Sequence, residues 1–174
     1  MKLAEHRDFD AAVLAAADHF RARGLRPAWI EKDYFVTDAL RSMVHHAPDR
    51  VVFKGGTSLS KGWNLIERFS EDVDIFLEVG EEGSRPPAKI VDKELTALRD
   101  AGAGGKLLVF SKEESRTFGG SGRNDVFRFD TKFGGPGEVA PRVLVEAGIA
   151  SGRRPLELRT LNSLLGEFLV ATGN

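Results

Sequence analysis

The chain opens with apolar residues at the spacing of amphipathic helices. A first group recurs every three or four residues and stops before Gly24, a residue suited to a helix C-cap. Its members are Phe9, Val13, Ala16, Ala17 and Phe20. Pro27 suits the first turn of a second helix, which we expect to run to about His46. The pattern therefore predicts an N-terminal pair of helices.

The rest of the chain alternates short apolar runs, typical of strands, with helical patterns. Strands are expected at 51–53, 72–79, 106–110, 126–132 and 142–146, and helices at 57–67, 88–100 and 161–170. Glycines mark the loops between the later strands, namely Gly119, Gly120 and Gly122, then Gly134, Gly135 and Gly137. This order predicts an α+β fold in which a mixed sheet carries helices on one face.

Composition narrows the class of protein without selecting a function. The 174 residues are 29% charged, 41% hydrophobic and carry a formal net charge of −1, which is ordinary for a globular protein and neither requires nor excludes nucleic acid. The absence of cysteine excludes disulfides and thiolate chemistry. The first residues lack the apolar core of a signal peptide, and no apolar run is long enough for a membrane span. We therefore expect a cytoplasmic protein with no membrane partner.

The segment after the strand at 51–53 has the features of a phosphate-binding turn. Paired glycines let the backbone approach a ligand, and the helix start that follows directs free N–H groups and a positive dipole end outward. The candidate residues are Lys54, Gly55, Gly56, Thr57, Ser58 and Lys61. The segment is not a Walker loop, and an ordinary strand-to-helix turn capped by Thr or Ser would look similar.

Two acidic residues on the next strand strengthen the phosphate-binding interpretation. Asp72 and Asp74 are two residues apart, so their side chains share one face of the strand. Adjacent carboxylates repel unless a cation lies between them, and such oxygen ligands suit Mg²⁺ or Mn²⁺. Glu146, the one acid in an apolar strand, is the best third ligand, with Asp130 as the second candidate. Without the turn before it, the aspartate pair is more simply a solvated strand face, and Glu146 is also consistent with a charge on an edge strand.

Basic residues gather after residue 115 and suggest a surface for an RNA backbone. They are Arg116, Arg123, Arg128, Lys132, Arg142, Arg153, Arg154 and Arg159. Scattered, solvated arginines are the simpler interpretation of the same pattern.

Together, the segments Gly55–Lys61 and Arg68–Asp74 resemble the AbiEii/MenT family of nucleotidyltransferase toxins, and 30–37 is similar to the helix that precedes them in that family. The resemblance implies a polymerase-beta-like nucleotidyltransferase fold and a type IV toxin–antitoxin system with an antitoxin partner. By position, Gly56, Thr57 and Ser58 match the triphosphate-binding motif, and Asp72 and Asp74 match the metal ligands. Ser70 matches a serine expected near the nucleotide phosphates.

The resemblance also implies a helical C-terminal half with a Thr-Phe-x-Glu-Lys type motif, which this sequence lacks. We therefore interpret 1–155 as the nucleotidyltransferase domain and 156–174 as the start of the C-terminal region, in a chain that is short or truncated for the family.

The expected activity is metal-dependent transfer of a nucleoside monophosphate from a nucleoside triphosphate (NTP) to an RNA acceptor, such as the 3′ end of tRNA. Two alternatives stay open. One is transfer to a protein or a small molecule, and the other is an inactive module that binds antitoxin or RNA.

Overall fold

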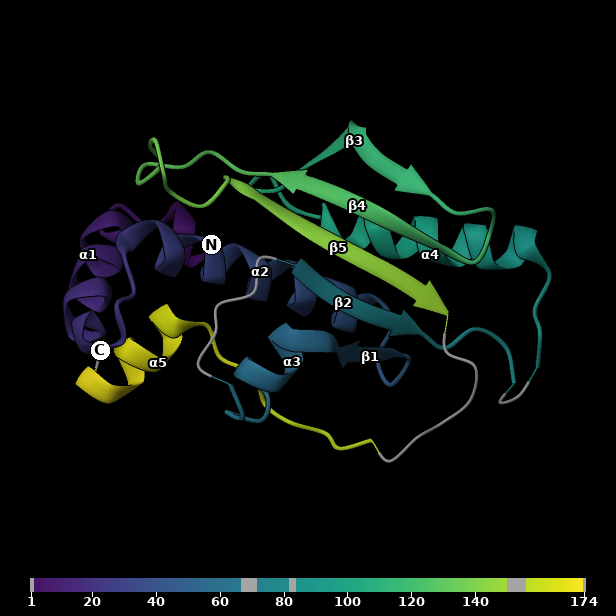
Figure 1. Cartoon of the computed structure of the whole chain (residues 1–174), viewed down its shortest axis with the longest axis horizontal. Helices are drawn as coiled ribbons and strands as arrows, with labels where there is room; N and C mark the ends of the chain where they lie inside the picture. Colours follow the sequence, from purple (N-terminus) through teal and green to yellow (C-terminus); the bar gives the residue numbers. More distant parts are fainter. Residues whose placement is uncertain (1, 67–71, 82–83, 150–155, 174) are drawn as a thin grey trace.

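The computed structural model describes residues 2–66, 72–81, 84–149 and 156–173 of the chain (Figure 1). An N-terminal 3₁₀ turn, η1 (Leu3–Glu5), precedes α1 (Phe9–His19), η2 (Arg21–Arg23) and α2 (Pro27–His46). The central part contains β1 (Val51–Lys54), α3 (Gly55–Lys61), β2 (Asp72–Leu77) and α4 (Ala88–Gly102). The hairpin of β3 (Val109–Thr117) and β4 (Gly122–Arg128) follows, then β5 (Arg142–Ile149) and α5 (Leu164–Thr172).

The five strands of the described residues form one mixed sheet in the order β1-β2-β5-β4-β3. Only the central pair, β2 and β5, is parallel, and the pairs on either side of it are antiparallel. The crossover from β2 to β5 includes α4 and the β3–β4 hairpin, so residues far apart in sequence become neighbours at the centre of the sheet.

Helices α2 and α4 pack behind the sheet, and the short α3 contacts β2 and the edge strand β1 (Figure 1). We call the face opposite α2 and α4 the open face. Alternate residues of the central strands point toward these helices and are buried, as period-two alternation requires. They are Val73, Ile75 and Leu77 on β2 and Val143, Val145 and Ala147 on β5. Helices α1 and α5 pack on α2 at one end of the molecule, where Leu165 and Phe168 join the same core.

The expected α+β architecture is confirmed, including the N-terminal helical pair and the mixed sheet with helices on one face. The expected bounds of α2 are also confirmed, because Pro27 begins it and His46 ends it. No helix in the described part of the chain is long and apolar enough to cross a membrane.

The strand bounds after α4 were predicted wrongly. Strand β3 starts at Val109 and runs to Thr117, and β4 starts at Gly122 and ends at Arg128. The prediction treated 119–122 as loop, but only Phe118 to Ser121 form the hairpin turn, where Gly119 and Gly120 have φ of 55° and 75°. Residues 129–132 leave the sheet because Thr131 and Lys132 bond to α2 instead.

The helix after β1 is also shorter than the predicted 57–67. It begins at Gly55 and ends at Lys61, with Gly62 as its C-cap. The guanidinium of Arg159 donates a hydrogen bond to the Gly62 carbonyl at 2.9 Å, so a segment from the far end of the chain closes this helix terminus. Such a long-range contact has no local sequence signal.

A buried carboxylate connects α2 to the loop after β4. Glu31 is 2% exposed and accepts hydrogen bonds from the Thr131 hydroxyl and, at 3.2 Å, from the Lys132 backbone N–H. Burial raises the pKa of Glu31 above its usual value of 4.5, and the hydrogen bonds offset only part of that rise.

Glu31→Gln should therefore change how stability depends on pH. The folded pKa is raised, so the native state favours protonated Glu31, and the contribution of Glu31 to stability falls as pH rises above 4.5. Urea titrations at a series of pH values measure the unfolding free energy of both proteins. The value for the natural chain minus the value for the variant should fall as the pH rises above 4.5. Glu114→Gln is the control of opposite sign, because the hydrogen bond from Arg128 lowers the pKa of Glu114. Equal pH dependence of the natural chain and the Glu31 variant would contradict this account.

Candidate active site

A row of polar side chains crosses the open face of the sheet, one from each strand. The strand registers pair Lys54 with Asp74, Asp74 with Glu146, Glu146 with Asn124 and Asn124 with Arg116. Paired residues point to the same face, so all five lie on one line of about 19 Å, given a spacing of about 4.8 Å between strands. We call these five residues the polar row.

Asp74 lies at the point where the polar row meets the start of α3. Its Oδ1 accepts a hydrogen bond from the Lys54 ammonium at 3.1 Å, and that ammonium also lies 4.7 Å from the centre of the Phe76 ring. The Asp74 side chain is 24% exposed, so this ion pair is accessible to a ligand. A carboxylate that already accepts one cation in this orientation has the chemistry to bind another.

Gly55 allows the Asp74 carboxylate to touch the backbone of α3. The residue has φ of 73°, and a Cβ at this position would overlap Asp74 Oδ2 and lie 2.7 Å from its Cγ. Both the backbone conformation and the space therefore require glycine. The same close approach places the carboxylate at the first residue of α3, beside the expected phosphate-binding turn.

The start of α3 offers backbone N–H groups more readily than hydroxyls. No side chain among the described residues caps this terminus, so its first N–H groups are open to an anion. The Thr57 hydroxyl instead donates a hydrogen bond to the Asp72 carbonyl at 2.5 Å. Thr57 and Ser58 are 3% and 8% exposed, which favours a structural use of their side chains. Gly56 follows Gly55 in the same helical turn.

Lys61 lies at the opposite end of α3 from Lys54. Its ammonium is 2.5 Å from Asp33 Oδ1, and the two side chains are 10% and 5% exposed. The structure thus brings Lys54 to the acidic residues and directs Lys61 into a buried ion pair with α2. Ser70 falls outside the described residues.

The acidic residues come from two neighbouring parallel strands. Glu146 lies beside Asp74 in register, and Asp72, on the same face of β2, is exposed. Asp74 bonds toward β1, whereas Glu146 accepts a hydrogen bond from the Asn124 amide on β4 at 3.0 Å. With the side chains so turned, no three acidic or histidine side chains of the described residues form a compact metal-binding group. Asp130 lies beyond the end of β4 and is not in the row.

The basic residues expected to form an RNA surface have different environments. Arg123 is buried and paired with Asp125, and it donates to Thr96 of α4, so it is not accessible to RNA. Arg128 and Arg142 both pair with Glu114, at 2.6 and 3.2 Å.

The remaining basic residues also differ in how accessible they are. Lys132 pairs with Asp10, and Arg159 stacks on Trp63. Arg153 and Arg154 are outside the described residues. Arg116 is exposed and forms no ion pair with the described residues, which makes it the most accessible cation of the polar row.

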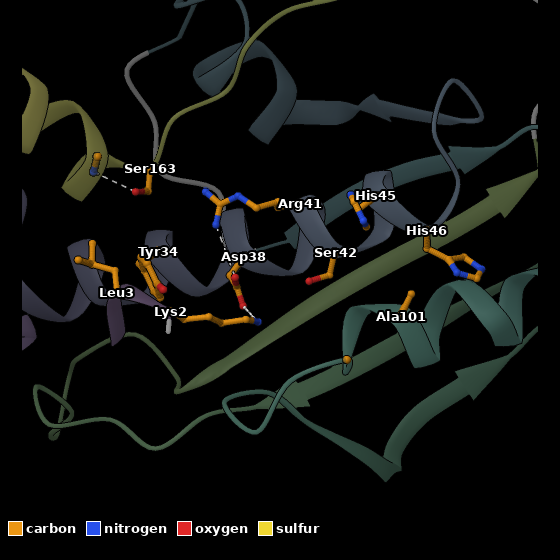
Figure 2. Close-up of a pocket in the computed structure, with 12 residues that line it drawn as sticks. Lys2, Leu3, Tyr34, Asp38, Arg41, Ser42, His45, His46, Ala101 and Ser163 are labelled. Carbon is orange, nitrogen blue, oxygen red and sulfur yellow. Dashed lines mark hydrogen bonds and ion pairs between the residues drawn. The ribbon is translucent and has the colours of Figure 1, made fainter. Parts of the chain in front are cut away.

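A separate cavity of about 700 Å³ lies along α2, between the end of α4 and the start of α5 (Figure 2). Asp38 is at its centre and pairs with Lys2 at 2.7 Å and with Arg41 at 3.6 Å. The described residues that line it include none from the polar row. The cavity is therefore distinct from the candidate active site.

Asn124 was not predicted from the sequence as a member of the candidate site. The glycines at 119, 120 and 122 predict a loop, so the expected strand begins only at Val126 and leaves Asn124 out. Extending the period-two alternation of the strand back to Gly122 would have placed Asn124 on the open face, two residues before Val126.

The arrangement of a polar row beside a glycine turn agrees with a comparison with protein families. A family model described as "Nucleotidyl transferase AbiEii toxin, Type IV TA system" matches residues 38–173. The chain therefore belongs to this family of nucleotidyltransferase toxins, whose fold is that of a nucleotidyltransferase and whose system implies an antitoxin partner. No curated protein matches the chain.

Gly55→Ala should be more harmful than alanine at another glycine with positive φ. Gly119 has φ of 55° and nothing within 4 Å of an added Cβ. Gly119→Ala should therefore lower the unfolding free energy only by the cost of a left-handed backbone, about 1–2 kcal/mol. Gly55→Ala adds the overlap with Asp74 and should lower the unfolding free energy further in urea titrations.

A double variant tests the source of the extra cost. Asp74→Ala should recover part of the loss when combined with Gly55→Ala, because it removes the overlapping atoms. Equal costs at the two glycines, or strictly additive effects of the two substitutions at 55 and 74, would contradict the assigned contact.

Proposed function

We propose that the chain transfers a nucleoside monophosphate from an NTP to the 3′ end of an RNA, with tRNA as the acceptor class, and that the polar row and the start of α3 form the site. The observation that carries this proposal is the position of Asp74, which lies beside Glu146 in register and against Gly55 at the phosphate-binding turn.

The triphosphate would bind where the backbone is most accessible. The N–H groups at Gly55 and Gly56 supply hydrogen bonds and the helix dipole favours negative charge, while Lys54 is close enough to exchange its bond with Asp74 for one with a phosphate oxygen. The buried side chains of Thr57 and Ser58 would support this turn from below, and Lys61 would act through Asp33.

The donor set fits a hard divalent cation. Asp72, Asp74 and Glu146 offer carboxylate oxygens from two adjacent strands, and these are the residues that would hold Mg²⁺ or Mn²⁺. Such an ion supplies neutralisation of phosphate charge and a more nucleophilic hydroxyl. Asn124 donates its amide hydrogen bond to one carboxylate oxygen of Glu146, so the other oxygen of Glu146 would be the one offered to the cation.

The proposed reaction is the nucleotidyl transfer of the family. The acceptor hydroxyl oxygen forms a bond to the α-phosphorus, the bond to the β-phosphate oxygen breaks, and pyrophosphate and the hydroxyl proton leave. Arg116 lies at the far end of the polar row from Lys54, and its exposed guanidinium would bind an acceptor phosphate along the open face. The chain would therefore supply mainly orientation and charge.

Removing either row carboxylate should abolish transfer without unfolding the protein. Asp74→Asn and Glu146→Gln keep side-chain size but lose the charge that binds a cation, so the rate of nucleotide transfer should fall on the order of a hundredfold or more. Asp130→Asn is the matched control, since that acid lies outside the row. The assay follows radiolabel from an α-³²P-labelled NTP, with circular dichroism to verify folding. Full activity in the two row variants would refute the assigned site.

The acceptor is tested in the same assay with different mixtures. Label should enter total RNA, and purified tRNA should compete for it. Label in the protein or small-molecule fraction would show that the acceptor is not RNA. NTP binding without any transfer would favour a binding module.

A further inference from the structure

Asp33 joins three helices through one buried carboxylate. The residue lies on α2 and is 4% exposed. Its Oδ1 accepts a hydrogen bond from the Lys61 ammonium of α3 at 2.5 Å, and its Oδ2 accepts one from the Leu164 backbone N–H, at the first residue of α5, at 2.7 Å. Both oxygens are engaged, and an ammonium and a helix N-terminus are the partners that a buried carboxylate needs.

Helix α3 depends on such contacts for its position. It has seven residues, which is shorter than a helix that persists in water without tertiary support. Its start is fixed by the Thr57 hydroxyl on the Asp72 carbonyl, and its end by Lys61 on Asp33. Because the pair of Lys61 and Asp33 is shielded from water, salt screens it little.

We infer that Asp33 is a positioning residue for nucleotide binding. By holding Lys61 it fixes the C-terminal end of α3 on the helical layer, and this sets where the N–H groups of Gly55 and Gly56 point relative to Asp74. The inference rests on the proposed function, in which those groups bind the triphosphate. Among the described residues, Asp33 itself forms no hydrogen bond or ion pair with the polar row or with Gly55 and Gly56.

The alternative role for Lys61 is that of a direct phosphate ligand. The two roles differ in what happens when the Asp33 charge is removed. A direct ligand would be released by Asp33→Asn and would bind phosphate as well or better. If the pair of Lys61 and Asp33 instead positions α3, Asp33→Asn would break that pair, and the turn at Gly55 and Gly56 would bind nucleotide more weakly.

Asp38 provides a matched control on the same helix. It is 2% exposed and also pairs with cations, but those are Lys2 and Arg41 beside the cavity along α2 (Figure 2). It has no contact with α3 among the described residues. Asp38→Asn therefore removes an equally buried charge from α2 without releasing the nucleotide-binding turn.

The experiment compares the natural chain, Asp33→Asn and Asp38→Asn at a temperature where all three are folded. Calorimetry measures binding of Mg²⁺ with an NTP that is not hydrolysed between its α- and β-phosphates. Asp33→Asn should raise the Kd on the order of tenfold, and Asp38→Asn should leave it within about twofold. Hydrogen exchange of peptides covering 55–61, without nucleotide, should be faster in Asp33→Asn alone.

A double variant separates positioning from simple stability. Asp33→Asn leaves the buried Lys61 ammonium without its hydrogen-bonded anion and with only the electrostatic interaction of Glu167, and adding Lys61→Met removes that charge, so stability should recover in the double variant. Nucleotide binding should stay weak, because no contact replaces the pair. Recovery of both properties would overturn the inference, as would unchanged or tighter binding in Asp33→Asn.

The hydrogen-exchange result distinguishes failure of the proposed function from failure of the inference about Asp33. If the natural chain binds no NTP, the proposed function fails, and faster exchange in 55–61 still shows whether Asp33 fixes α3. If the natural chain binds NTP but Asp33→Asn and Asp38→Asn exchange alike in this segment, only the inference about Asp33 fails.

Discussion

The in-register parallel pairing of β2 with β5 is the constraint on which the candidate site depends. It sets Asp74 beside Glu146 in the middle of the sheet, although the two residues are separated by α4 and a whole hairpin. A slip of one residue would turn Glu146 toward the helices and bring its apolar neighbour to the open face. The burial of Val73 and Val145 against the helices therefore fixes the register. The register in turn determines which side chains lie on the open face.

The second requirement is that α3 be fixed at both ends. At its start the Asp74 carboxylate lies against Gly55, where no side chain would fit. At its end Lys61 is held by Asp33, which is part of the helical layer behind the sheet. The open face and the helical core are thus coupled through one short helix, and contacts with the core set the position of the turn proposed to bind nucleotide.

Local patterns predicted most of the fold, and they indicated the part of the candidate site that is local in sequence. Helix α2 could be bounded because Pro27 begins it, and the glycine turn with Asp74 was visible as a motif of adjacent segments. The β4 start and the membership of Asn124 in the site were missed, because glycines in a hairpin do not reveal which of them already belongs to the strand. The bond of Lys61 with Asp33 was also missed, since pairing between two helices has no sequence period.

The central claim is that the Asp74 and Glu146 carboxylates bind a divalent cation together with a nucleotide at the start of α3. Electron paramagnetic resonance of Mn²⁺ tests it most directly, with free Mn²⁺ titrated against protein in the presence of an NTP analogue. We predict tight binding by the natural chain, and binding weakened on the order of tenfold or more in Asp74→Asn, because one of the coordinating charges is lost. Equal Mn²⁺ affinity in the two proteins, with both folded, would contradict the account.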